Sequence, residues 1–356
     1  MAQKALIAMS GGVDSSVAAL LMRMKGYECI GATMKLYHNE DIGLHRGHTC
    51  CSLEDVEDAR SVAYRLGMLH YVFNFSEHFR QKVMEPFVRA YETGQTPNPC
   101  IDCNRYLKFD VLHRRARELH CDYVVTGHYA RVEYDENREK FLLKKAISAT
   151  KDQSYVLYSM TQEELAHTLF PLGGMEKSEA RRIAEENGLI TARKHDSQDI
   201  CFVPDGDYAA FIERFTGQAY PEGDFLDEQG RILGRHRGII RYTVGQRKGL
   251  GLSFPEPMYV KAIDPARNAV VLAPERSLYR AELTARDVNL IALDAIERPM
   301  RVQAKVRYSQ KARWATAEQR GEKLYLRFDE PQRAITKGQA VVLYDGEIVV
   351  GGGTIE

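Results

Sequence analysis

A run of small residues directly after an apolar segment constrains this chain more than any other feature. Residues 5–7 read Ala-Leu-Ile, and residues 8–16 read AMSGGVDSS. Gly11 and Gly12 accept backbone angles that other residues avoid, and they let backbone N–H groups approach an anion closely. The serines of the run add hydroxyl donors, and the N-terminus of a helix expected from Ser15 to about Lys25 is electropositive. The pattern predicts a strand, a phosphate-binding turn and a helix.

This turn differs from the two common glycine-rich nucleotide loops. A Walker A loop reads Gly-x-x-x-x-Gly-Lys-Ser/Thr and a dinucleotide fingerprint reads Gly-x-Gly-x-x-Gly, and the run fits neither. A pyrophosphate cradle, in an enzyme that splits ATP between the α- and β-phosphates, is the functional interpretation. A structural Gly-Gly turn with a capping serine is the alternative. The functional interpretation places ATP on Ala8, Met9, Ser10, Gly11, Gly12, Val13, Asp14 and Ser15.

Strands and helices alternate up to about residue 130, which predicts a parallel sheet with helices on both faces. Strands are expected at 4–9, 29–36, 69–75 and 123–126. Because ligands of such sheets bind beyond the carboxyl ends of the strands, Met34 and Gly127 become candidate nucleotide contacts. For Met34 a place in the core is an equally good interpretation.

After Pro204 the pattern changes to short glycine-rich segments and strands of period two, such as residues 302–308 and 324–328. The end of the chain reads as a hairpin with an Asp345-Gly346 turn. Before the change, a helix over 178–187 is expected to begin with a serine cap. The expected fold is α/β: a doubly wound parallel catalytic domain (1–205), a small central β-rich domain (206–278) and a C-terminal β-barrel (279–356).

Composition narrows the class of protein. A chain of 356 residues needs two or three domains, and its 49 basic residues balance 49 acidic ones. Zero net charge argues against indiscriminate coating of nucleic acid but leaves room for a local basic surface. Apolar stretches fall short of the roughly 18 residues that span a bilayer, and an export signal is lacking, so we expect a cytoplasmic protein without membrane contact. Seven cysteines in such a chain favour thiol or metal chemistry.

Two cysteine segments are candidates for that chemistry. Cys100 and Cys103 form a C-x-x-C pair after two prolines, at the expected start of a helix. A helix N-terminus lowers the pKa of a thiol, so Cys103 is a candidate nucleophile, while a redox pair, half of a zinc site and iron–sulfur ligands stay open. Cys201 is either a third reactive thiol or a small buried residue beside Phe202.

The other cysteines are expected to be structural. The vicinal pair Cys50-Cys51 follows two histidines, but adjacent cysteines rarely ligate one ion, which favours a loop over the active site. Cys29 and Cys121 lie in or beside predicted strands and are expected in the core.

The whole chain resembles the tRNA-specific 2-thiouridylase family (MnmA) of the ATP pyrophosphatase, or PP-loop, superfamily. The resemblance is carried by motifs from end to end. They are residues 9–16, Thr96-Pro97-Asn98-Pro99 with Cys103-Asn104, Thr126-Gly127-His128-Tyr129, residues 151–155, Asp196-Ser197 with Ile200-Cys201-Phe202, residues 243–251 and the terminal Gly351-Gly352-Gly353.

The resemblance implies thiolation at C2 of the wobble uridine in tRNAs for Lys, Glu and Gln. ATP adenylylates the C2 oxygen, and sulfur then displaces AMP. It implies that Cys201 carries the sulfur as a persulfide, that Cys103 is the nucleophile and ends in a disulfide with Cys201, and that Asp14 helps to hold Mg²⁺ and pyrophosphate. The tRNA contacts that it implies are Asn98, Pro99, His128, Lys151, Asp152, Gln153, Arg247, Lys248, Arg307, Tyr308 and Gln339.

Cys100 departs from the family pattern, because many members have Asp at this position. Together Cys100, Cys103 and Cys201 could ligate three irons of a [4Fe-4S] cluster and leave the fourth iron open to sulfide, an arrangement that a subset of tRNA-thiolating enzymes resembles. The persulfide and cluster mechanisms therefore both stay open. The sulfur donor is a cysteine desulfurase, a relay protein or sulfide.

A run of basic residues indicates a phosphate-binding surface. Between residues 231 and 248 six basic residues occur without an acidic one, and the neighbouring acids at 222–228 are segregated from them in sequence. A solvated face is the alternative. Two other functions compete: a PP-loop ligase that acts on a small molecule, and a non-catalytic nucleotide-dependent RNA-binding protein. The first has no use for the cysteines and the basic run, and the second releases no AMP.

Overall fold

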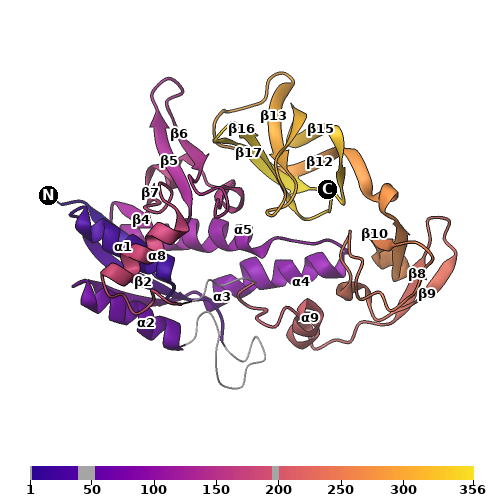
Figure 1. Cartoon of the computed structure of the whole chain (residues 1–356), viewed down its shortest axis with the longest axis horizontal. Coiled ribbons are helices and arrows are strands. Elements are labelled where there is room, and N and C mark those ends of the chain that lie inside the picture. Colours follow the sequence, from indigo (N-terminus) through magenta and orange to yellow (C-terminus); the bar gives the residue numbers. More distant parts are fainter. Residues whose placement is uncertain (1, 39–52, 195–199) are drawn as a thin grey trace.

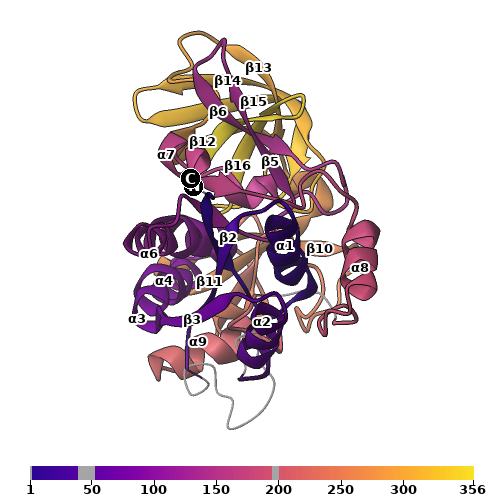
Figure 2. The same ribbon diagram turned by 90° about the vertical axis from the view of Figure 1, so that its left-hand side faces the viewer.

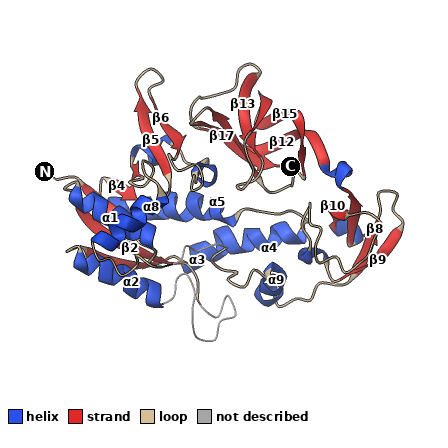
Figure 3. Cartoon of the chain, viewed as in Figure 1, coloured by secondary structure: helices blue, strands red, loops and turns tan. Residues whose placement is uncertain are grey.

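The structure is a computed structural model that describes residues 2–38, 53–194 and 200–356. Figure 1 shows a layered α/β part that contains the N-terminus, a small β-rich part at the far end, and a barrel that contains the C-terminus. Figure 3 shows that helices are concentrated in the first part and strands in the other two. In the described part of the chain, no helix combines the length and the apolar character needed to cross a membrane.

The first part is built on a parallel sheet of five strands. Its order is β3-β2-β1-β4-β7, and every neighbouring pair is parallel. The strands are β1 (Lys4–Ala8), β2 (Glu28–Lys35), β3 (Leu69–Asn74), β4 (Tyr123–Val125) and β7 (Thr168–Leu169). The predicted parallel sheet is confirmed, with the strand ends within two residues of those expected.

Helices cover both faces of this sheet, as the alternation predicts. In β1, Leu6 and Ala8 belong to one core cluster, and Ala5 and Ile7 belong to another on the opposite face. The second cluster takes in α1 (Val13–Met24), α2 (Leu53–Arg65) and α8 (Lys177–Glu186). The first takes in α3 (Ser76–Phe79), α4 (Glu85–Glu92) and α6 (Leu112–Glu118). Cys29 and Cys121 lie in these cores, as predicted.

Two pairs of helices are joined through π-helical turns. Residues 80–84 link α3 to α4, and residues 104–111 link α5 (Pro99–Cys103) to α6. Within the described residues, the other α-helices are α7 (Gln162–Ala166) and α9 (Tyr208–Thr216). The expected serine cap of α8 is wrong, because the helix begins at Lys177 after Glu176, which makes no side-chain cap.

The central part shares its core with the first. Its sheet has the order β10-β11-β8-β9. The strands are β8 (Gly223–Leu226), β9 (Ile232–His236), β10 (Met258–Asp264) and β11 (Ala269–Pro274). Phe202 and Phe225 are fully enclosed in the same cluster as Leu6 of β1. Phe202 packs edge-to-face on Phe87 of α4 at 5.2 Å, so the segment with Cys201 is held between the two parts.

The C-terminal part is the predicted barrel. Six antiparallel strands close on themselves because β12 pairs with both β15 and β17. They are β12 (Tyr279–Leu290), β13 (Met300–Lys305), β14 (Arg313–Arg320), β15 (Lys323–Arg333), β16 (Ala340–Asp345) and β17 (Ile348–Ile355). The β16–β17 hairpin is confirmed, but its two loop residues are Gly346 and Glu347 rather than Asp345 and Gly346.

A hairpin from the first part extends the barrel sheet, which the pattern of the sequence does not predict. It consists of β5 (Ala130–Asp135) and β6 (Lys140–Lys145). Lys144 of β6 pairs with Ile348 of β17, and the Lys145 N–H donates to the Glu347 carbonyl at 2.8 Å. Figures 1 and 2 both show this hairpin beside the barrel.

Gly352 lets the barrel pack closely on the first part. A Cβ at this position of β17 would lie 2.4 Å from the Val341 carbonyl oxygen and 2.8 Å from the Tyr158 ring. Tyr158 is itself almost fully buried. Neither a paired strand nor a buried ring moves without loss of contacts.

We therefore expect Gly352→Ala to lower the free energy of unfolding by about 1–3 kcal/mol through overpacking. Urea denaturation followed by circular dichroism measures the change. Gly174→Ala is the matched control, because a Cβ there meets no atom within 4 Å. Equal midpoints for the two variants would contradict the predicted contact.

Candidate active site

The residues after β1 form an open turn at the N-terminus of α1. Gly11 has φ +74°, and a Cβ there would lie 2.3 Å from the Asp55 carbonyl oxygen, so only glycine fits. Gly12 is the N-cap of α1 and provides no side-chain cap. The first N–H groups of this 12-residue helix therefore lack the side-chain acceptor that a capping residue provides, which suits an anion. The capping serine of the structural alternative is wrong, and phosphate binding by the turn stays a prediction.

The serines of the turn organise it from within. Ser15 Oγ donates to the Gly12 carbonyl at 3.0 Å and lies 3.2 Å from the Ser10 N–H, which donates to it. Ser10 is the exposed residue of the turn, whereas Ala8, Met9 and Val13 are buried. Of the predicted ATP contacts, these three can reach a ligand only through their backbone.

Asp14 lies in a charged cluster that joins three segments. Lys177 Nζ is 2.7 Å from both carboxylate oxygens, and the Tyr129 hydroxyl donates to Oδ1 at 2.9 Å. Gly127 packs against the backbone at the start of α1, since a Cβ there would lie 2.8 Å from the Ser15 nitrogen. The structure thus brings Gly127 to the turn as predicted, and it adds Lys177, which sequence reasoning missed because a lone lysine before a helix carries no spacing signal.

His128 and Met34 face inward. The His128 ring is 8% exposed, lies 2.7 Å from Thr126 Oγ1 through Nδ1, and packs against Phe170. Burial holds the pKa of His128 well below its usual value, so the ring is neutral at pH 7. Its predicted tRNA contact requires a rearrangement that exposes it. Met34 is partly buried against the core cluster around Phe79, so both interpretations of Met34 stay predictions.

The C-x-x-C segment starts α5 but places its two thiols differently. Asn98 caps the helix by accepting from the Cys100 N–H at 3.2 Å, with Pro99 in the first turn. Cys100 is exposed, whereas Cys103 lies one turn further and is 9% exposed. Burial raises the pKa of Cys103 to about 11. The expected lowering of its pKa is wrong, because desolvation outweighs the helix N-terminus.

Cys201 is half-buried, and its carbonyl accepts from the Tyr37 hydroxyl at 2.8 Å. Asp196, Ser197 and the Cys50-Cys51 pair lie outside the described residues. Within the described ranges, no group of three His, Cys, Asp or Glu side chains is arranged to hold a metal ion. A [4Fe-4S] cluster holds its cysteines further apart than a single ion does, so the cluster interpretation of Cys100, Cys103 and Cys201 stays a prediction.

Several predicted tRNA contacts have internal partners. The Asp152 carboxylate accepts from the N–H groups of Ala146 and Ser154 and from Ser154 Oγ. Gln153 accepts from the Tyr129 N–H at 2.9 Å, and so holds the segment beside Asp14. Lys151, which precedes them, is partly exposed. Asp152 and Gln153 thus shape the site, and a direct tRNA contact from either stays a prediction.

Two more of these residues join the barrel to its neighbours. Gln339 donates to the carbonyls of Thr96 and Pro97, just before the C-x-x-C segment. Arg307 donates to the carbonyl of Val244 in the central part and to the Ala334 carbonyl and Thr336 Oγ1 of the barrel part. Tyr308 is 42% exposed.

The basic run of residues 231–248 is only partly available to a ligand. Arg231 pairs with Asp227 at 2.6 Å, Arg235 with Asp224 at 3.1 Å and Arg241 with Glu213 at 2.7 Å. The expected segregation of acids is wrong in space, because the β8–β9 pairing places Asp224 opposite Arg235. Arg237, Arg247 and Lys248 are exposed.

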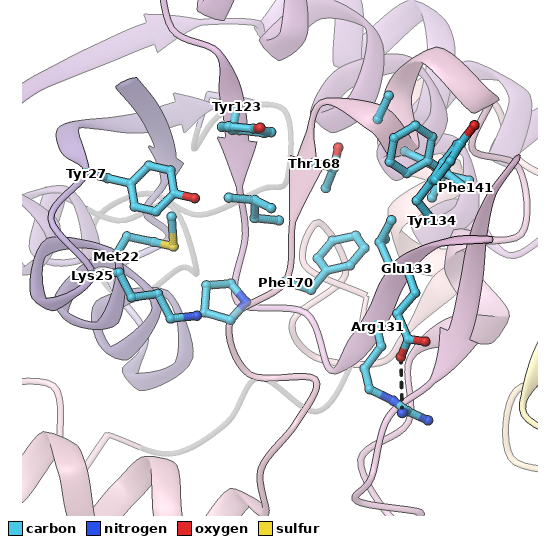
Figure 4. Close-up of a pocket in the computed structure, with 15 residues that line it drawn as sticks. Met22, Lys25, Tyr27, Tyr123, Arg131, Glu133, Tyr134, Phe141, Thr168 and Phe170 are labelled. Carbon is cyan, nitrogen blue, oxygen red and sulfur yellow. Dashed lines mark ion pairs between the residues drawn. The ribbon is translucent and has the colours of Figure 1, made fainter. Parts of the chain in front are cut away.

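A cavity of about 470 Å³ lies at the other end of the strands (Figure 4). Tyr27 and Tyr123 meet edge-to-face at 6.1 Å on one side, and the Arg131–Glu133 ion pair at 3.5 Å lies on another. Tyr123 begins β4, whereas the phosphate turn follows the end of β1. None of the predicted site residues lines this cavity.

Family models match almost the whole chain. A tRNA methyl transferase HUP domain matches residues 3–205, a tRNA methyl transferase PRC-barrel domain matches 209–274, and an aminomethyltransferase beta-barrel domain matches 280–355.

Curated relatives are similar over their full length. The tRNA-specific 2-thiouridylase MnmA of Clostridioides difficile is 53% identical over 357 residues, which cover 100% of this chain and 99% of the relative. That of Acetivibrio thermocellus is 51% identical and covers 99% of each. A solved 4-thiouridine synthetase–RNA complex with bound ATP is 19% identical, covers 60% of this chain and 53% of its own, and has a TM-score of 0.39.

The burial of Cys103 predicts a difference in thiol reactivity. At pH 8 we expect iodoacetamide to alkylate exposed Cys100 well before Cys103, whose pKa is raised to about 11 by burial. The rate at Cys103 rises about tenfold per pH unit below that value, because the thiolate is the nucleophile. Peptide mass spectrometry of the native protein measures both rates. Faster labelling of Cys103 at pH 8 would contradict the assignment.

The ion pair of Asp14 predicts a role for Lys177 in nucleotide binding. We expect Lys177→Gln to weaken Mg·ATP binding about tenfold, because it removes positive charge beside the turn that is proposed to bind the phosphates. Isothermal titration measures the Kd. Lys177→Arg keeps the charge and is the matched control. An unchanged Kd for Lys177→Gln would show that Lys177 plays no part in nucleotide binding.

Proposed function

The chain belongs to the tRNA-specific 2-thiouridylase (MnmA) family, and on this premise we propose that it activates C2 of the wobble uridine with ATP and replaces its oxygen by sulfur. It is a tRNA-uridine 2-sulfurtransferase. The observation that carries the proposal is the full-length identity of about half, together with an uncapped phosphate turn at α1. Methyl transfer, which the family-model descriptions mention, is not proposed, because the full-length relatives are named as thiouridylases.

The first half-reaction uses the turn after β1. The α- and β-phosphates of ATP would lie on the N–H groups of Gly11 to Ser15, and Lys177 would offset their charge. The uridine C2 oxygen attacks the α-phosphorus and pyrophosphate leaves. Asp14 would hold Mg²⁺ together with phosphate oxygens, since one carboxylate plus substrate phosphates is a usual Mg²⁺ ligand set. The ion would neutralise charge on the leaving pyrophosphate.

The second half-reaction uses the two partly or fully buried thiols. A Cys201 persulfide attacks C2 and AMP leaves, so that the uridine is joined to Cys201 through two sulfurs. The Cys103 thiolate then attacks Cys201 Sγ and breaks the S–S bond. The electron pair stays on the outer sulfur, which becomes the C2 thiocarbonyl, and a Cys103–Cys201 disulfide forms. A thiol reductant must restore both cysteines before the next turnover.

A [4Fe-4S] route through Cys100 stays the second candidate, because residue type alone does not separate a thiolate that ligates iron from one that attacks. In the persulfide route Cys100 is an exposed thiol one helical turn before Cys103. The sulfur comes from a cysteine desulfurase, a relay protein or sulfide.

The tRNA would lie across the exposed residues of all three parts, which we assign to 1–205, 206–278 and 279–356. Arg247 and Lys248 would bind phosphates, while Asn98, Pro99, Lys151 and Tyr308 would lie near the target nucleotide. The uridine must leave the base stack, because its C2 oxygen is otherwise out of reach. Since mature tRNA is the substrate, we place the enzyme in the cytoplasm.

We expect purified protein to convert ATP to AMP only when unmodified tRNA is present, and to form 2-thiouridine when a persulfide donor is added. Cys103→Ser and Cys201→Ser should lose at least about 100-fold in thiolation, because each removes an obligatory sulfur, while AMP formation persists. Nucleoside mass spectrometry measures the product.

The same assay separates the alternatives. AMP formation without tRNA would indicate a small-molecule ligase, and absence of AMP would indicate a binding protein. Thiolation that requires anaerobic iron–sulfide reconstitution, with an electron paramagnetic resonance signal lost in Cys100→Ser, would replace the persulfide route by the cluster route.

A further inference from the structure

Two lysines from different parts of the chain lie over one buried tyrosine ring. Tyr344, in β16, has no exposed surface. Lys145 Nζ, at the end of β6, is 4.5 Å from the centre of that ring, and Lys305 Nζ, at the end of β13, is 5.9 Å from it. Because both distances share the ring centre, the separation of the two nitrogens cannot exceed their sum. The two like charges thus share one ring, and the charge of Lys305 contributes to lowering the pKa of Lys145.

The backbone fixes this arrangement. Lys145 follows Lys144, which pairs with Ile348 of the barrel, and Lys145 Nζ also donates to the Gly346 carbonyl at 2.8 Å. Lys305 pairs with Val342, two residues before Tyr344. Figures 1 and 2 show the β5–β6 hairpin beside the barrel strands that contribute the other residues. The two lysines are thus placed by sheet register and not by chance contact of exposed side chains.

The nearest carboxylates have other partners. Asp152 accepts hydrogen bonds from Ala146 and Ser154, and Glu347 pairs with Arg131 at 2.9 Å. Across residues 2–38, 53–194 and 200–356, neither lysine has an ion pair within 4 Å. Burial lowers the pKa of Lys145. The charges of Asp152 and Glu347 oppose that change, and the charge of Lys305 adds to it. An anion bound to both ammonium groups would offset this repulsion.

The lysine pair lies near the thiol segment. The Tyr344 hydroxyl lies 3.5 Å from Ser154 Oγ, and the ring of the next residue, Tyr155, meets the Tyr308 ring at 6.0 Å. Burial raises the pKa of Tyr308, and the charges of Asp152 and Cys100 add to that rise. Tyr344 and Tyr308 therefore connect the lysines to the exposed thiol of Cys100. An anion on the lysines would therefore lie toward the C-x-x-C segment, beside which the target base is proposed to bind.

We propose that Lys145 and Lys305 together bind a phosphodiester group of the tRNA strand next to the target uridine. The inference rests on the proposed function. Ammonium groups offer only donors and positive charge, which suits a phosphate, and the fully buried Tyr344 ring offers no face for base stacking. The phosphates of ATP are the less favoured ligand, because they belong at the turn after β1 with Lys177.

The test measures tRNA affinity against salt concentration for full-length protein. Each phosphate contact that a lysine makes contributes about 0.7–0.9 to the slope of log K against log salt. We expect Lys145→Gln and Lys305→Gln each to reduce the slope by about that amount, and the double variant to weaken binding about tenfold or more at low salt. Fluorescence anisotropy with labelled tRNA gives the slopes, and the KM for ATP should not change.

Matched variants distinguish the loss of charge from a loss of packing. Lys145→Arg and Lys305→Arg retain the charge and should keep the wild-type slope, which separates charge from packing. Lys25→Gln removes an exposed lysine that directly follows α1 and does not contact the Tyr344 ring, and should leave the slope unchanged. Thermal unfolding confirms that each variant is folded.

Two results overturn the inference: an unchanged slope in a folded double variant, or a raised KM for ATP with an unchanged slope, which would place nucleotide phosphates on the lysines. If wild-type protein binds no tRNA at all, the proposed function fails instead, and the two failures are distinguished.

Discussion

The close packing of two glycines, one against the start of α2 and one against the start of α1, is the constraint on which the site depends. Gly11 lies against the backbone of Asp55, and Gly127 lies against the backbone of Asp14 and Ser15. A side chain at Gly11 would push α2 away from the strand ends, and a side chain at Gly127 would push α1 away. The N-cap of α1 is Gly12, which has no side chain to accept from the first N–H groups of the helix. The helix N-terminus therefore stays open to an anion. Asp14 then ties α8 to the same place through Lys177.

The site is completed from outside the parallel sheet. Gln339 of the barrel donates to the backbone just before α5, and Arg307 joins the barrel to the loop that precedes Arg247. Gln153 and Asp152 hold the segment between the hairpin and the nucleotide turn. Arg307 and Gln339, which are predicted to contact tRNA, thus use some of their hydrogen bonds to hold the three parts together. The proposed tRNA surface therefore depends on the correct assembly of the three parts.

The fold could be predicted well from sequence because its signals are local. The alternation of strands and helices, the glycines after β1 and the period-two strands of the barrel all act over short distances. What could not be predicted depends on distant contacts. The burial of Cys103 follows from packing among helices, the pairing of Arg235 with Asp224 follows from strand register, and Lys177 meets Asp14 across 163 positions.

Because of the β5–β6 hairpin, the boundary between the first part and the barrel does not fall at one point of the sequence: the hairpin lies within the first part of the sequence but belongs to the barrel sheet. β5 begins at Ala130, directly after the Gly127–Tyr129 segment at the nucleotide turn, and β6 ends on the barrel. A fragment that stops before the barrel would leave β6 as an exposed edge, with backbone groups available to any other strand. Separate expression of the N-terminal part would therefore favour aggregation, and recombination between relatives should exchange the hairpin together with the barrel.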